Sequence, residues 1–178
     1  MNSINQNQGG DHQADLLGGA AVAKIRELVK SAQTCFFCTN GSKGESAGTR
    51  PMNVREVDDA GNLWFLCASD SHTRAELAAD PQVKLYFQGS PHSNFLLLAG
   101  VATLSNDAGI IRKLWEPILK TWFTEGVDDP RITVVHFTPE NGYYWDNKHG
   151  DLVAGAKILI GATIGKTLDD SIEGTLNV

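Results

Sequence analysis

The sequence has 178 residues, with 15 lysines and arginines against 21 aspartates and glutamates, so its formal net charge is −6. This length is typical of one domain with room for a sizeable core, and a composition of 42% hydrophobic and 20% charged residues excludes a largely disordered chain. The acidic balance argues against nucleic acids and anionic membrane surfaces as partners, because both require a positively charged protein face.

The start of the chain and its cysteine content indicate the cellular compartment. Residues 1–13 are polar and lack the apolar core of a signal peptide, so we expect a disordered leader followed by a single domain over residues 14–178. Three cysteines are too few for a secreted disulfide framework. The longest apolar run is about half of the ~20 residues that a membrane-spanning helix needs. These features predict a soluble, cytoplasmic protein.

Hydrophobic periodicity and turn residues predict a mainly β chain with a few helices. Scattered glycines, 18 in all, favour many tight turns. Residues 16–32 have apolar side chains at helical spacing and predict an amphipathic helix. Short apolar or alternating runs between turn residues predict strands at residues 34–39, 47–57, 63–68, 83–88, 95–105, 132–137 and 143–145.

Two shorter helices are expected between these strands. Thr73 and Glu76 have the spacing of a capping box, which predicts a helix start at Thr73. Asp107 opens a second helix, and Pro117 either kinks it or starts another, because proline lacks an amide donor. The tail from Leu152 onward fits both a strand and a helix.

Several motifs are better explained by structure than by chemistry. Cys35 and Cys38 form a Cys-x-x-Cys, but positions three apart on a strand point to opposite faces. We therefore interpret these two and Cys67 as core thiols. Residues 161–167 resemble a phosphate-binding P-loop, yet the spacing between the glycines is one residue short. The histidines show no metal-ligand spacing, and no hydrolase nucleophile motif is present.

A group of polar residues near the middle of the chain is typical of a phosphate site. Arg50 and Pro51 interrupt an apparent strand, and proline there indicates an edge or an irregular point at which backbone can face a ligand. A second polar group follows, between a predicted strand and the start of a predicted helix. It consists of Ser69, Ser71, His72, Thr73 and Arg74. Hydroxyl groups, an arginine and the free amides of a helix N-terminus suit a single phosphate. The alternative is a hydroxyl-rich cap with Thr73 as the N-cap residue and no ligand.

Taken together, these segments resemble the flavin-binding split-barrel superfamily of proteins like pyridoxamine 5'-phosphate oxidase, and within it the bacterial general stress protein branch. The resemblance covers residues from about Val22 to Lys166. It rests on an ordered set of short segments at residues 49–52, 63–67, 70–72, 80–83, 98–102, Trp115, 122–123, 126–130, 144–146 and 165–166.

The resemblance implies a six-stranded split β-barrel with flanking helices, a homodimer, and FMN in a groove at the dimer interface. It also implies that the ambiguous tail is helical. By this resemblance Arg50 contacts the FMN phosphate, which Ser71 and His72 approach, and Trp145 reaches the flavin of the partner subunit. The ring is expected beside Pro51, Met52 and Asn53, with Leu66 and Cys67 lining the cofactor from the third strand.

The chain departs from the family pattern at two sites. Thr73 stands where the family commonly has a lysine and Cys67 where it has a threonine, so one phosphate contact is lost and Arg74 is the available substitute. The substrate-phosphate motif of the authentic oxidase is absent after Trp145, which disfavours oxidation of pyridoxamine phosphate. We therefore expect an FMN-binding, general stress-type protein with flavin-dependent oxidoreductase activity on an unknown substrate. The alternatives are a non-catalytic module that sequesters or senses flavin, and a split barrel that has lost FMN and binds another small ligand.

Overall fold

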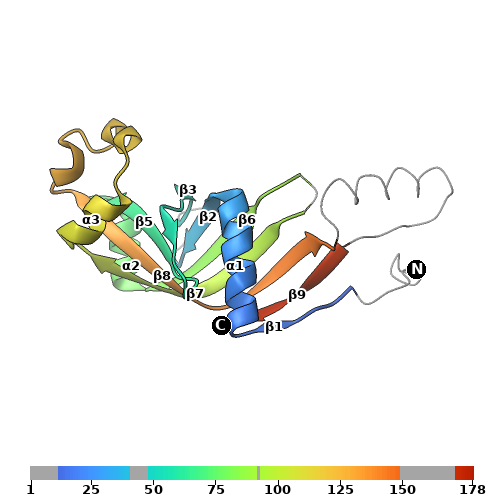
Figure 1. Cartoon of the computed structure of the whole chain (residues 1–178). Helices are drawn as coiled ribbons and strands as arrows, with labels where there is room; N and C mark the ends of the chain where they lie inside the picture. Colours follow the sequence, from blue (N-terminus) through green and yellow to red (C-terminus); the bar gives the residue numbers. More distant parts are fainter. Residues whose placement is uncertain (1–11, 41–47, 92, 149–170) are drawn as a thin grey trace.

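A strongly bent β-sheet forms the body of the protein (Figure 1), and the computed structural model describes residues 12–40, 48–91, 93–148 and 171–178. The strands are β1 (Leu16–Leu17), β2 (Thr34–Thr39), β3 (Thr49–Asn53), β4 (Glu56–Val57), β5 (Leu63–Ala68), β6 (Gln82–Gln88), β7 (Phe95–Ser105), β8 (Ile132–Asn147) and β9 (Ser171–Asn177). The helices are α1 (Gly19–Ala32), α2 (His72–Ala79) and α3 (Ala108–Leu114), with 3-10 helices η2 (Pro117–Thr121) and η3 (Gly126–Asp128).

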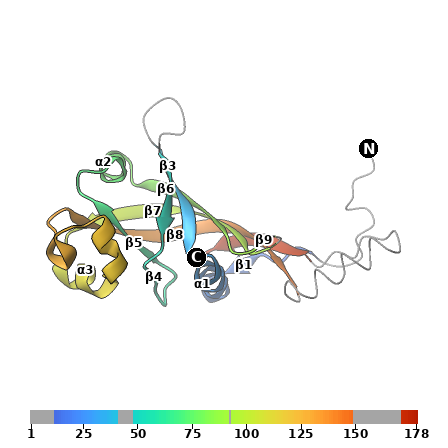
Figure 2. The same ribbon diagram turned by 90° about the horizontal axis from the view of Figure 1, so that it is seen from above.

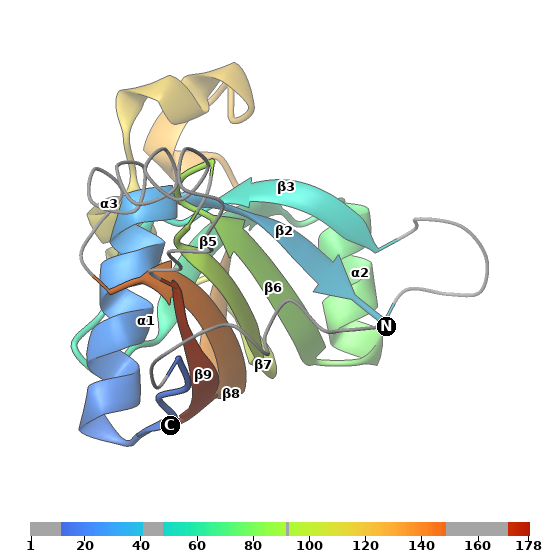
Figure 3. The same ribbon diagram turned by 90° about the vertical axis from the view of Figure 1, so that its right-hand side faces the viewer.

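Six antiparallel strands follow one another in the order β3-β2-β6-β7-β8-β5 (Figure 3). The long strand β8 has two neighbours on one side, because its first half pairs with β5 and its second half with β9. Strand β4 pairs with β5, and β1 runs parallel to β9. The series therefore begins at β3 and ends at β5, which confirms the predicted mainly β split barrel with flanking helices.

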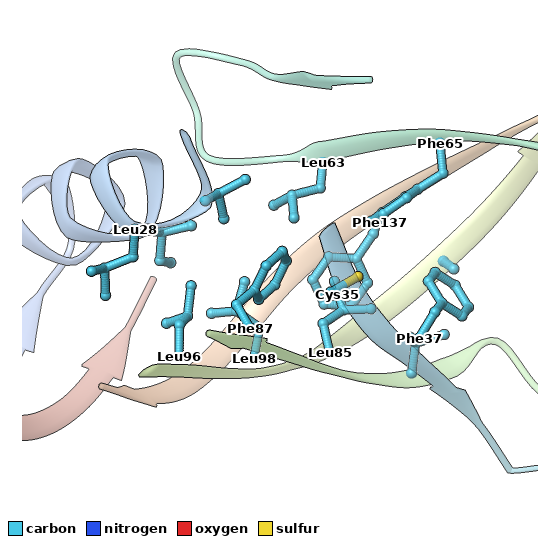
Figure 4. Close-up of a cluster of buried hydrophobic side chains, with 14 of the residues drawn as sticks. Leu28, Cys35, Phe37, Leu63, Phe65, Leu85, Phe87, Leu96, Leu98 and Phe137 are labelled. Atoms are coloured by element: carbon cyan, nitrogen blue, oxygen red, sulfur yellow. The ribbon is translucent and has the colours of Figure 1, made fainter. Parts of the chain in front are cut away.

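The main hydrophobic core lies between α1 and the inner face of this sheet (Figure 4). The amphipathic face of α1 contributes Ile25 and Leu28, which are buried against side chains of the sheet. Within this core, Phe37 and Phe65 meet edge to face, with ring centroids 5.3 Å apart. On the outer face of the same strands, Phe36, Tyr86 and Trp145 are exposed in the part of the chain that the structure describes.

A second cluster of apolar side chains joins a helical lobe, made of α3, η2 and η3, to strands β5 and β8 at one end of the molecule (Figure 2). Asp107 caps α3 by accepting a hydrogen bond from the amide of Ile110 at 2.9 Å, as predicted. A separate 3-10 helix begins at Pro117, so the second of the two expectations for this proline is correct.

Two predicted strands, at residues 132–137 and 143–145, are one continuous strand in the structure. β8 passes through Pro139 at a bulge, where the pairing with β7 shifts by one residue between Ala99 and Gly100. A Cβ atom on Gly100 would lie 2.1 Å from the backbone oxygen of Thr138, so only glycine fits this close approach. The opposite correction applies to residues 47–57, because β3 and β4 are separate strands.

The start of α2 differs from the predicted capping box. Ser71 is the N-cap residue, and its Oγ accepts a hydrogen bond from the amide of Arg74 at 3.3 Å. Thr73 lies inside the first turn, where it is buried, so the prediction of Thr73 as N-cap is wrong. A tertiary contact explains the burial of Thr73, because its hydroxyl accepts a hydrogen bond from the side chain of Arg50 in strand β3.

The two ends of the described chain meet at β9. The amide of Glu173 donates to the carbonyl of His12 at 2.8 Å, and Gln13 forms a bridge with Glu173. Strand β9 replaces the helix expected for this part of the tail, because its residues complete the pairing of β8. The rest of the tail, including the P-loop-like residues 161–167, and residues 1–11 of the leader lie outside the described residues. Among the described helices, none is both long and apolar enough to cross a membrane.

Candidate functional site

Aromatic side chains cover the outer face of the sheet opposite α1. One row crosses four strand pairs, with Pro51 beside Phe36, Phe36 beside Tyr86, Tyr86 beside Leu97, and Leu97 beside Tyr143. A second row places Phe95 beside Trp145. Exposed fractions on this face are high for such residues, at 58% for Phe36 and 49% for Trp145. We call this surface the outer aromatic face.

A groove of about 450 Å³ lies on the outer aromatic face. Its lining residues are Thr34, Cys35, Phe36, Pro51, Tyr86, Phe87, Gln88, Phe95, Leu96, Leu97, Tyr143 and Trp145. No lining residue is formally charged at neutral pH, and six are aromatic. At the rim, the Tyr143 hydroxyl donates a hydrogen bond to Glu173, and this bond, together with burial, raises the pKa of Tyr143 to about 12. The groove therefore suits a flat, largely apolar group.

Strand β3 borders this groove and is the first strand of the series. The amide of Thr39 donates to the carbonyl of Gly48, and the amide of Val54 donates to the carbonyl of Gln33. Antiparallel pairing alternates, so the even-numbered residues of β3 bond to β2, whereas the backbone of Pro51 and Asn53 faces the open edge. Proline is tolerated there because it has no amide to leave unpaired. The predicted edge position of Pro51 is thus explained by the register.

Neighbouring residues of β3 point to opposite faces, and Arg50 points away from the groove toward α2. Its guanidinium donates to the Thr73 hydroxyl at 2.6 Å and forms an ion pair with Glu76. The hydroxyl of Thr39, at the end of β2, donates to the same Glu76 oxygen at 2.7 Å. These four residues, which we call the Arg50–Glu76 network, connect β2 and β3 with α2.

The carboxylate of Glu76 is ionised in this network. Burial acts to raise the pKa of Glu76, but hydrogen bonds from Thr39 and Arg50, together with the charge of Arg50, outweigh burial and lower that pKa below its usual value. The positive charge of Arg50 is therefore already balanced within the protein. Sequence reasoning identified Arg50 and Thr73 but missed Glu76 and Thr39 as their partners, because both contacts join distant parts of the chain.

The remaining predicted phosphate-site residues lie at the start of α2. Ser71 hydrogen-bonds to the carbonyl of Ala68 at 2.5 Å, and His72 and Arg74 are exposed. The Cys67 thiol is buried on the inner face, where burial raises its pKa, while a hydrogen bond from Ser71 and the charges of Arg74 and Arg50 oppose this rise. The structure thus brings Cys67 to the same region as Arg50, Ser71 and Arg74.

The other predicted site residues lie on three different surfaces: the helical lobe, the main core and the groove. Leu66 points to the opposite face of β5 from Cys67 and packs against the helical lobe. Met52 packs against the main core, on the same side of β3 as Arg50. Pro51 and Trp145 both line the groove, which also has three aromatic residues that sequence reasoning did not single out, Tyr86, Phe95 and Tyr143. Alternation along the strands was the signal that could have found them.

The cysteines and histidines that the structure describes add no further site. The three cysteines are free thiols, and Cys35 and Cys67 are buried as predicted. Cys38 is half-buried on the outer face of β2, so its interpretation as a core thiol is wrong. Across residues 12–40, 48–91, 93–148 and 171–178, no three histidine, cysteine or acidic side chains gather in a way that could hold a metal ion.

Comparisons with known proteins agree with this architecture. A candidate general stress protein 26 from Jannaschia sp. CCS1 superposes with a TM-score of 0.73 at 20% identity, over 88% of this chain and 97% of that one. A general stress FMN/FAD binding protein from Xanthomonas citri gives a TM-score of 0.58 at 23% identity, over 68% and 84%. Protein bli-3 of Neurospora crassa is 24% identical over 155 residues, or 80% of this chain and 74% of that protein. Residues 20–169 match the family model described as pyridoxamine 5'-phosphate oxidase like. The chain therefore belongs to the pyridoxamine 5'-phosphate oxidase-like family.

Proposed function

We propose that this chain binds FMN across strand β3, with the flavin ring on the outer aromatic face and the phosphate beside Arg50. One observation carries the proposal: two adjacent residues of an edge strand serve different surfaces. Pro51 lines the apolar groove, whereas Arg50 reaches the start of α2 on the other side of the strand. A ligand with a flat apolar ring joined to an anionic tail can contact both surfaces by passing the open edge.

The chemistry of the donor groups fits most of such a ligand. The groove offers aromatic side chains and the open edge of β3 offers backbone groups near Asn53 for the ring. For the phosphate, Arg50, Ser71, His72 and Arg74 supply donors near a helix N-terminus, where a negative charge is favoured. The negative charge of the Glu76 carboxylate opposes the binding of a phosphate by these donors. Of the two β5 residues, Cys67 faces Arg50 and is the one we assign to the site.

We also propose a homodimer in which the outer aromatic faces of two copies meet. Phe36 and Trp145 are about half exposed, and so much aromatic surface is more typical of an interface than of a monomer surface. In this arrangement Trp145 contacts the flavin of the partner subunit. The solved structure described as a general stress FMN/FAD binding protein supports the flavin assignment.

The activity we propose is a flavin-dependent oxidoreduction in the cytoplasm. When bound, the flavin supplies electron transfer, and the residues of this chain bind it, orient it and exclude water from the ring. A second candidate function is reversible flavin storage or sensing without catalysis. The pairing of Arg50 with Glu76 favours this candidate, because it leaves less charge to hold the phosphate.

Spectroscopy of the purified protein tests the proposal. We expect a yellow protein, or a colourless one that becomes yellow with added FMN. We expect Arg50→Ala to weaken FMN retention by roughly ten-fold or more, because it leaves the carboxylate of Glu76 unpaired beside the phosphate. Arg112→Ala is the matched control, because Arg112 forms an exposed ion pair on the helical lobe. Failure to bind FMN refutes the proposal and favours another small ligand.

Reduction experiments separate the two candidate functions. Bleaching of the bound flavin by NADH or NADPH without oxygen, followed by reoxidation by a specific acceptor, supports the oxidoreductase. A flavin that binds but is not reduced by either donor supports storage or sensing.

A further inference from the structure

The Arg50–Glu76 network places a negative charge where a phosphate is expected to bind. Glu76 accepts hydrogen bonds from both Arg50 and Thr39, and the side chains of Arg50 and Glu76 are only 21% and 18% exposed. The carboxylate is thus held from two sides and partly shielded from water. A ligand phosphate that contacts Arg50 must share its guanidinium with Glu76.

The distances involved make this sharing costly for a dianionic phosphate. Two anions bonded to one guanidinium lie within roughly 6–7 Å of each other, inside the ~8 Å Debye length at physiological salt, so salt does not remove their repulsion. Within the network, the charge of Glu76 cancels that of Arg50. Among the described residues at the start of α2, the exposed side chain of Arg74 then supplies a positive charge, and the exposed carboxylate of Asp70 supplies a negative one.

The donors of Arg50 are also partly used. Its guanidinium already donates one bond to Thr73 and one to Glu76, out of five N–H groups. The two partners come from the first and second turns of α2, so they fix the plane of the guanidinium relative to that helix. The phosphate therefore gains less from Arg50 than it would from an unpaired arginine.

We propose that Glu76 determines which flavin the site prefers, by making its affinity nearly independent of the terminal phosphate, so that riboflavin binds about as tightly as FMN. This inference rests on the proposed flavin site, and it deepens that proposal by naming the ligand class as flavins in general. The ring contacts on the outer aromatic face then provide most of the affinity.

Titration of the flavin-free protein with FMN and with riboflavin, followed by quenching of flavin fluorescence, tests the inference. We expect the two dissociation constants of the unaltered protein to agree within about three-fold. Glu76→Gln is expected to tighten FMN binding by roughly ten-fold and to leave riboflavin binding unchanged. Asp80→Asn is the matched control, because it removes the same charge from the far end of α2, where Asp80 is the C-cap residue; it is expected to leave both affinities unchanged.

Distinct results overturn the inference and the proposed function. The inference alone fails where the unaltered protein prefers FMN over riboflavin by about thirty-fold or more, or where a folded Glu76→Gln variant binds FMN less tightly; in the second case Glu76 only orients Arg50. The comparison of the two flavins on the unaltered protein decides the matter if the variant does not fold. If neither flavin binds to any of these proteins, the proposed function fails and the inference fails with it.

Discussion

Replacement of Phe36 by aspartate is expected to convert the proposed homodimer into monomers. Phe36 is 58% exposed on the outer aromatic face. An aromatic side chain has an area of roughly 200 Å², so about 120 Å² of Phe36 is available to a partner copy. Twofold symmetry doubles this area, and at ~25 cal/mol per Å² it contributes at most about 6 kcal/mol to the free energy of association. That loss corresponds to a dimer weakened by roughly 10⁴-fold.

The assay is light scattering or sedimentation over a range of protein concentrations, with thermal unfolding as a check on the fold. Trp122→Asp is the matched control, because Trp122 is 63% exposed but belongs to the helical lobe. We expect the control to remain dimeric. If Phe36→Asp stays dimeric while Trp122→Asp dissociates, the interface lies on the helical lobe and the reasoning from exposed aromatic surface is refuted.

Two further predictions concern stability. Gly100→Ala is expected to destabilise the fold by about 3 kcal/mol in urea denaturation, because its Cβ would overlap a backbone oxygen of the paired strand. Gly19→Ala, whose Cβ would meet no atom within 4 Å, is the control, and an equal loss in both variants would contradict the packing argument. Burial lowers the pKa of the His136 imidazole, with Asp58 partly opposing, so the unfolded state binds more protons. Stability is therefore expected to be full above the unfolded value of 6.5 and to fall as the pH drops through the lower folded value. His136→Gln is expected to reduce this fall between about pH 8 and about pH 5, and an unchanged pH dependence would refute the assignment.

The strands and helices that follow local patterns could be predicted from the sequence. The bounds of β2 agree with the prediction, because they are set locally: α1 ends at Ala32 with Gln33 as its C-cap, and the turn residue Asn40 follows Thr39. β8 was divided in two because Pro139 and Gly142 are typical of turns, whereas here they occupy a bulge and a close approach to β7. The conformation at such positions depends on the neighbouring strand, and the hydrophobic pattern along a single strand carries no information about that neighbour.

The candidate site was predictable in its polar residues and less so in its partners. Arg50, Ser71 and Arg74 were identified because charge and hydroxyl groups near a helix start have a local signature. The sequence pattern places Glu76 in a capping box. Its contact with Arg50 depends on the packing of α2 against β3, which only the fold shows. The sequence shows which charged groups are present near the site. Which of these charges pair with one another, as Arg50 pairs with Glu76, depends on the tertiary structure.

The same contact joins β3 to α2 and explains why the site is proposed to bind a phosphate weakly. Strand β3 begins the series of strands, and it is joined to α2 through Arg50, Thr73 and Glu76. Removing the carboxylate would free Arg50 for an anionic ligand but would also loosen this connection. A protein that relied on phosphate for affinity would need an unpaired cation here, whereas one that binds the flavin ring on its aromatic face can use Arg50 to hold its own fold together. The Arg50–Glu76 network is therefore the place where stability and ligand preference are expected to oppose each other.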